Sequence, residues 1–154
     1  MMTIDYMVLA DAAAAPEGKH YIHGGGWDQI WATRFPTTHP LIAVAFLLRV
    51  PWNDANIPQR VELDVVNADG ASILPSPPGA MGGPITVGRP AGAVPGNDLL
   101  VPFVFNLAML TFPEPGDYVV TMSIDGKEAK RFPIHLTTMP PRPGIAPIAR
   151  MERQ

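Results

Sequence analysis

Residues 117–136, with the sequence DYVVTMSIDGKEAKRFPIHL, contain two runs in which apolar and polar side chains alternate. A period of two predicts β-strands with one face in a core and the other face largely exposed to water. Asp125-Gly126 separates the runs, and an Asp-Gly pair at such a position is typical of a tight hairpin turn. The stretch therefore predicts an antiparallel hairpin. Because proline has no N–H to donate, Pro133 predicts that the second strand is an edge strand.

Two longer runs, residues 40–50 and 99–112, are apolar on both faces. Periodicity alone does not distinguish a buried strand from a buried helix in such runs. Their β-branched and aromatic residues favour strands, and the flanking prolines and Pro102 argue against helices. We expect both runs to be central strands of their sheets.

The alternation recurs at residues 60–65, and further strands are predicted around the glycines at 24–26, over residues 3–10, 19–23 and 27–34. About eight strands in hairpins predict an all-β fold, an antiparallel two-sheet sandwich. Residues 115–118, PGDY, open a late strand in the manner of a tyrosine corner. We therefore expect the sandwich to be immunoglobulin-like.

The composition supports this fold and excludes several classes of protein. The chain has 154 residues, 47% hydrophobic and 16% charged, with 19 prolines, 14 glycines and no cysteine. Because an interior proline costs a helix about 3 kcal/mol, a helical bundle is excluded. The net charge of -3, without a basic stripe, argues against a nucleic-acid partner. No apolar run approaches the roughly 20 residues that cross a bilayer, so we expect no membrane insertion. The absence of cysteine and of a signal-peptide pattern favours the cytoplasm.

Two segments are rich in proline and lie outside the alternating runs. Residues 75–98 contain six prolines and six glycines and predict a long loop, with a short strand at residues 85–87. Residues 137–154 show no periodicity and predict an extended arm after a sandwich domain of residues 1–136. Function often resides in such segments. The candidate partner-binding residues are Arg89, Pro90, Pro140, Pro141, Arg142, Pro143, Ile145 and Ile148.

The most suggestive catalytic string is His23-Gly24-Gly25-Gly26-Trp27, which is similar to the oxyanion-hole segment of lipases and esterases. That chemistry also needs a G-x-S-x-G nucleophile, and none of the three serines of this chain lies in such a motif. The glycines are therefore interpreted as a turn. His20 and His23 have metal-ligand spacing on a helix, but on a strand they face opposite sides. We predict no catalytic residue, no metal site and no cofactor.

Three tryptophans could line a ligand cleft. Trp27, Trp31 and Trp52 are candidate stacking platforms for a carbohydrate or another small ligand. The competing interpretation is that they are partly buried core residues with one polar edge.

The chain also resembles a known family. The resemblance is carried by residues 9–12 (LADA), 18–19 (GK), 22–26 (IHGGG), 50–56 (VPWNDAN), 69–70 (DG), 87–90 (VGRP) and 116–118 (GDY). These segments are similar to those of small uncharacterised proteins found largely in actinobacteria, over nearly the whole domain without the tail. The resemblance implies a β-sandwich and no known activity, and it supplies no catalytic residues.

The sequence thus predicts a non-enzymatic interaction or structural module, a subunit or accessory of a larger assembly. A protein partner or a second copy of the chain would contact the 75–98 loop and the C-terminal arm. A ligand-binding module that uses its tryptophans is the alternative, and a hydrolase comes third.

Overall fold

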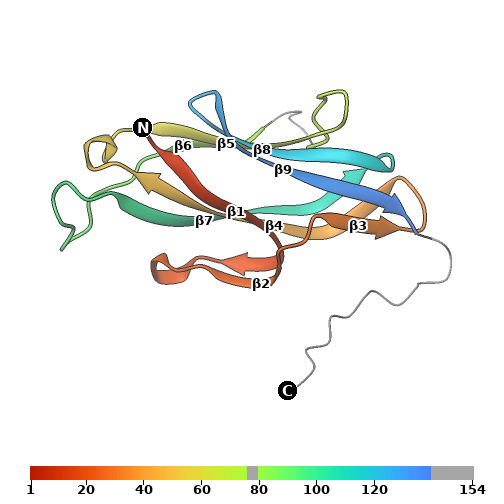
Figure 1. Ribbon diagram of the computed structural model, residues 1–154, viewed down its shortest axis with the longest axis horizontal. Coiled ribbons are helices and arrows are strands. Elements are labelled where there is room, and N and C mark those ends of the chain that lie inside the picture. The colour runs from red at the N-terminus through yellow and green to blue at the C-terminus, as the bar shows by residue number, and fades with distance from the viewer. Residues whose placement is uncertain (76–79, 140–154) are drawn as a thin grey trace, which may run out of the picture.

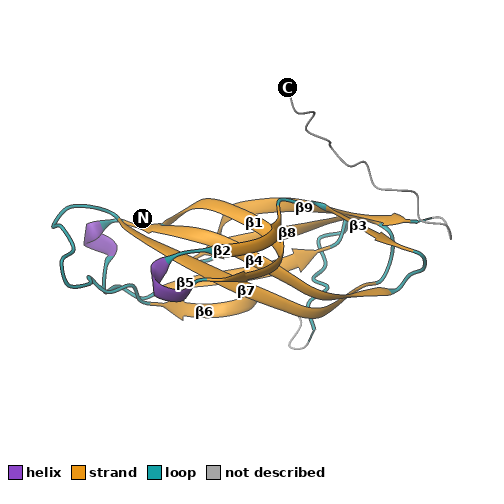
Figure 2. Cartoon of the chain, turned by 90° about the horizontal axis from the view of Figure 1, so that it is seen from below, coloured by secondary structure: helices purple, strands orange, loops and turns teal. Residues whose placement is uncertain are grey.

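The computed structural model describes residues 1–75 and 80–139, and over these ranges the chain forms two sheets that pack around one core (Figures 1 and 2). Sheet A has the strand order β2-β1-β4-β7, and sheet B has the order β3-β9-β8-β5-β6. The strand bounds are β1 Thr3–Ala14, β2 Tyr21–Gly25, β3 Gln29–Ala32, β4 Thr37–Val50, β5 Gln59–Val66, β6 Met81–Ile85, β7 Leu99–Phe112, β8 Gly116–Ile124 and β9 Lys127–Thr138. The predicted all-β class and its two sheets are confirmed. The pairing is antiparallel except between β3 and β9, which run parallel.

The hairpin predicted from residues 117–136 is confirmed as β8 and β9. Both turn residues, Asp125 and Gly126, have positive φ angles, 49° and 80°, as a two-residue primed turn requires. The prediction that β9 is an edge strand is wrong, because β9 lies between β3 and β8. Pro133 is tolerated there because β3 pairs with β9 only from His135 onward. At the proline itself, β8 is the single neighbouring strand.

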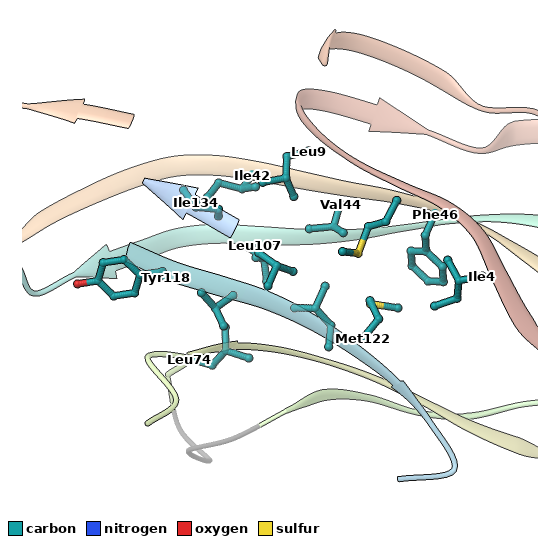
Figure 3. Packing of buried hydrophobic residues seen from close by; sticks show 14 of the residues in the cluster. Ile4, Leu9, Ile42, Val44, Phe46, Leu74, Leu107, Tyr118, Met122 and Ile134 are labelled. Atoms are coloured by element: carbon teal, nitrogen blue, oxygen red, sulfur yellow. The ribbon is translucent and has the colours of Figure 1, made fainter. Parts of the chain in front are cut away.

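The core lies between the two sheets and is made by the buried faces that the alternation indicated (Figure 3). Val61, Leu63 and Val65 of β5 are fully buried, and so are Val120 and Met122 of β8. From sheet A the core receives Ile42, Val44, Phe46 and Leu48 of β4 and Leu107 of β7. Burial of these side chains provides the main driving force for packing the sheets together.

The two runs that are apolar on both faces have different places in sheet A. The first run is β4, which is central, as predicted. The second run is β7, which is an edge strand, so the prediction of a central strand is wrong for it. β7 pairs with β4 along one of its edges, over thirteen residue pairs from Thr37↔Phe112 to Val50↔Leu99. An edge position also explains why Pro102 is tolerated within a strand.

β7 changes the face that it turns to the core at Met109. Phe105 and Leu107 point inward, whereas two residues later Met109 is 66% exposed. Met109 has a φ of 53°, a left-handed conformation that is rare for a residue with a side chain. Leu110 and Phe112 beyond it are buried again. Because of this change, Leu110 and Phe112 face the core, where a strict alternation continued from Leu107 would place Met109 and Thr111.

The β1–β2 hairpin folds back over sheet A, on the face that points away from sheet B. Residues 3–10 of β1 pair with β4, whereas residues 10–14 pair with β2 (Figure 1). At the tip of this hairpin, His20 contacts the hydroxyl of Tyr6 in β1 and the carbonyl of Phe103 in β7. β4 lies between those two strands, so His20 spans the sheet. Three alanines on this outer face, Ala10, Ala43 and Ala45, have no exposed surface.

The 75–98 segment is less irregular than its composition indicates. It contains β6, which pairs with β5, so the short strand lies at Met81–Ile85 and not at residues 85–87 as predicted. Beyond β6, the carbonyl of Val87 accepts a hydrogen bond from the N–H of Asn56, and turns follow at residues 90–97. β9 continues to Thr138, so its last two residues lie within the predicted arm of residues 137–154. The helical pieces in the described ranges are two three-residue 3-10 turns, so no helix there is long and apolar enough to cross a membrane.

Replacing Tyr118 by phenylalanine tests the turn that opens β8. The Tyr118 hydroxyl donates to the carbonyl of Glu114 at 2.7 Å and accepts from the Glu114 N–H at 3.2 Å. Because Tyr118→Phe leaves both backbone groups of Glu114 without this partner, we expect a loss of about 0.5–1.5 kcal/mol in the free energy of unfolding. Denaturant titration measures it. Tyr21→Phe, at an exposed tyrosine, is the matched control, and equal losses for the two variants would contradict the assignment.

Candidate functional site

A hollow beside β3 contains two of the three tryptophans. Its volume is about 340 Å³, and its lining residues are Asp11, Trp27, Gln29, Ile30, Trp31 and His39. These residues come from β1, from the link between β2 and β3, from β3 and from β4. The hollow therefore forms where the chain leaves the folded-back hairpin of sheet A and enters sheet B. We call it the tryptophan hollow.

Trp27 is held in place by the glycine segment before it. Its indole Nε1 donates to the carbonyl of Gly24 at 2.9 Å, and its ring lies 5.9 Å from the ring of His39. Gly24 has a φ of 61°, and a Cβ at this position would collide with the carboxylate of Asp11. The glycine requirement is therefore conformational and steric. The absence of a side chain lets the Asp11 carboxylate lie against Gly24, the residue whose carbonyl holds the Trp27 indole.

The titratable side chains that line the hollow are one carboxylate and one histidine. Asp11 is exposed, and its carboxylate makes no hydrogen bond or ion pair with any residue of the described ranges. Burial lowers the pKa of His39, and the nearby Asp11 opposes this shift only partly. His39 is therefore neutral at pH 7. Trp31 is 52% exposed, so much of its ring is open to solvent.

Trp52 does not join the other two tryptophans. The Arg89 guanidinium lies over its ring, with the guanidinium carbon 4.2 Å from the ring centroid. Arg89 Nη2 also donates to the Trp52 carbonyl at 2.7 Å. The candidate partner-binding residue Arg89 thus contacts its own chain, while its neighbour Pro90 is exposed. The candidate residues of the arm, Pro140, Pro141, Arg142, Pro143, Ile145 and Ile148, lie outside the described residues.

His20 and His23 do not converge on one point. His20 Nε2 donates to the carbonyl of Phe103 at 2.9 Å, and its Nδ1 lies 2.7 Å from the Tyr6 hydroxyl. Because a carbonyl can only accept, Nε2 carries a proton in this arrangement. His23 lies on β2 opposite Ala12 and is exposed. In the described part of the chain, no three His, Asp or Glu side chains are placed to hold a metal ion.

A histidine flanked by two carboxylates lies on the outer face of sheet B. His135 Nδ1 is 2.7 Å from Asp117 Oδ1, and its Nε2 is 4.0 Å from Asp28 Oδ2. The hydrogen bond to Asp117 raises the pKa of His135 above its ordinary value of 6.5, with a smaller contribution from Asp28. Sequence reasoning missed this cluster. A register shift between Met122 and Ser123 decides which residue of β8 faces His135.

The outer faces of the two sheets differ in charge. On sheet B the outward positions of β5, β8 and β9 carry charged or titratable side chains: Arg60, Glu62, Asp64, Asp117, Arg131 and His135. On sheet A the ion pairs that Arg49 makes with Asp5 and Asp98 lie at one end. The rest of β4 and β7 there is uncharged, and Leu100 is 52% exposed. The uncharged edge strand β7 borders this outer face.

Comparisons with known proteins give one family and one solved structure. The sequence pattern of a group described as "Family of unknown function (DUF6941)" matches residues 5–137. A solved structure, alkylpurine DNA glycosylase AlkC from Pseudomonas fluorescens bound to DNA containing an abasic site analog, is similar at a TM-score of 0.40 and 14% identity. The match covers 88% of this chain and 30% of the glycosylase chain. A search of curated protein sequences found no match.

The His135 cluster predicts a pH dependence with a defined sign. A raised pKa means that the folded protein binds the proton more tightly, so the stabilisation is complete below pH 6.5 and is lost as the pH rises through the raised pKa. We expect the NMR titration of His135 to give a pKa above 6.5 and Asp117→Asn to bring it back toward that value. Asp69→Asn, at an exposed turn, is the control. A His135 pKa that Asp117→Asn leaves unchanged would contradict the assignment.

Proposed function

The chain belongs to the DUF6941 family of unknown function, and we propose that it is a non-enzymatic interaction module, a subunit or accessory of a larger assembly. The 75–98 loop and the 137–154 arm remain proposed contact segments. The immunoglobulin-like form of the two sheets belongs to the same proposal and is supported by the hydrogen bond from Tyr118 to Glu114, as in a tyrosine corner. A cytoplasmic location is proposed from the cysteine-free sequence.

The proposal rests on strand β7, an edge strand without charge. It is 14 residues long, contains no charged residue and lies at the edge of sheet A. No other segment of residues 1–75 and 80–139 makes a backbone hydrogen bond to its free side. Sheet edges that stay unpaired usually carry lysine or another charge that discourages strand addition. β7 lacks such a charge, so its free edge is suited to accept another strand.

The partner that we propose for this edge is a second copy of the same chain. In a two-fold dimer the same patch meets itself, so a charged strand would place like charges opposite each other. β7 has no charge to repel its copy. Pro102 and the left-handed Met109 interrupt the strand, so the region available for antiparallel pairing lies between them. Val104 and Asn106 occupy outward positions in that region.

The loop end supplies a second apolar surface. Val94 is 59% exposed and follows the turn that begins at Pro90. An exposed aliphatic side chain in a loop whose base is packed by Arg89 and Trp52 supports the role of the 75–98 segment as a contact.

The β7 edge is tested by adding charge to it. We expect the chain to run at twice its mass of 16.6 kDa in light scattering and the double variant Val104→Lys with Asn106→Lys to run as a monomer, because two lysines on each copy would face each other. Thr121→Lys, on the outer face of sheet B, is the matched control and should leave the dimer intact. A wild-type monomer, or a dimer that survives both lysines with its fold intact, would overturn the pairing at β7.

The arm is tested by its removal. We expect deletion of residues 140–154 to shift the dissociation of the dimer to higher protein concentration, because extended arms commonly add to a neighbouring sheet edge. Sedimentation velocity over a concentration series measures the shift. An unchanged dissociation curve would remove the arm from the proposal while leaving the β7 contact in place.

A further inference from the structure

We propose that the tryptophan hollow binds a compact organic cation, such as a quaternary or methylated ammonium group. The site joins two indole rings and one carboxylate, from Trp27, Trp31 and Asp11. It is independent of the association proposed at β7, because no residue that lines it belongs to that strand.

The two rings are suited to a cation because one is fixed and the other is open. The hydrogen bond from Trp27 Nε1 to Gly24 holds the first indole before any ligand arrives. Trp31 stands on β3 with 52% of its surface exposed. Its neighbour Ile30 is buried in the core and anchors the strand beneath it. Tryptophan is the aromatic side chain that attracts cations most strongly, and aromatic hollows are a common solution for quaternary ammonium groups.

The charge of the hollow selects a cation over a neutral ligand. Asp11 has no cationic partner within the described ranges, and neither lysine nor arginine lines the hollow. The other titratable lining group is His39, whose partial burial disfavours its charged form. The hollow thus presents one negative charge next to two indole rings, and an ammonium group complements both.

The size of the hollow also limits the ligand. A volume of about 340 Å³ is at the lower end of the range for small-molecule sites. A trimethylammonium head group fits such a volume, with the rest of the ligand in solvent. A neutral sugar could also stack on Trp31, but it would leave the carboxylate of Asp11 without a counter-charge.

Choline and its uncharged isostere 3,3-dimethyl-1-butanol form the test. Titration of the ¹⁵N-labelled full chain follows the indole N–H signals of the three tryptophans. We expect choline to shift the signals of Trp27 and Trp31 and to leave that of Trp52, which lies under Arg89, in place. The isostere should bind at least about tenfold more weakly, because it has the same shape without the charge.

Two variants test the contributions of the carboxylate and of the exposed indole ring separately. Asp11→Asn keeps the shape against Gly24 and removes the charge, and Trp31→Ala removes the exposed ring. Each should weaken choline binding by about three- to thirtyfold, whereas Asp69→Asn should not. Thermal unfolding of each variant verifies that the fold is kept.

Three outcomes would overturn the proposal. The first is equal binding of choline and its isostere, and the second is choline binding that Asp11→Asn leaves unchanged. The third is binding of methyl glucoside without binding of choline, which would assign the hollow to neutral sugars instead.

Discussion

The central strand of sheet A, β4, is apolar on both faces from Leu41 to Leu48, and this constraint decides which other parts of the chain must lie against it. One face packs on sheet B and forms the core with Val44 and Phe46. The other face, which contains Ala43 and Ala45, is covered by the β1–β2 hairpin, and His20 spans it at the tip. Alanines at these positions leave room for the hairpin to approach. The remaining apolar surface lies toward β7, where no described strand covers the edge.

The tryptophan hollow is a consequence of the same folding-back. After covering sheet A, the chain must cross to sheet B, and it does so through residues 26–28. The crossing places Trp27 between the hairpin and β3, beside Asp11 and His39. Gly24 permits the close approach, since a side chain there would displace the carboxylate of Asp11. One architectural requirement therefore produces both the cover of sheet A and the cluster of groups at its margin.

Local patterns predicted the strands, whereas their neighbours in space were predicted less well. The Asp125-Gly126 turn and the alternation around it were sufficient to predict β8 and β9, because those signals act between adjacent residues. The same logic made β9 an edge strand on account of Pro133 and β7 a central strand on account of its apolar faces. Both predictions were wrong, because edge status depends on which distant strand arrives alongside and over how many residues.

For the candidate site, the sequence by itself determined the residue types: tryptophans suited to stacking and a glycine run unsuited to a helix. It could not decide which tryptophans meet. Only the tertiary structure placed Trp27 and Trp31 in one hollow and set Trp52 apart under Arg89. His135 shows the same limit, because a one-residue shift in the hairpin decides that Asp117 faces it. Composition and periodicity describe residues that are close in the sequence. The contacts that make a site join segments that are distant in the sequence, and only the packing of the two sheets brings those segments together.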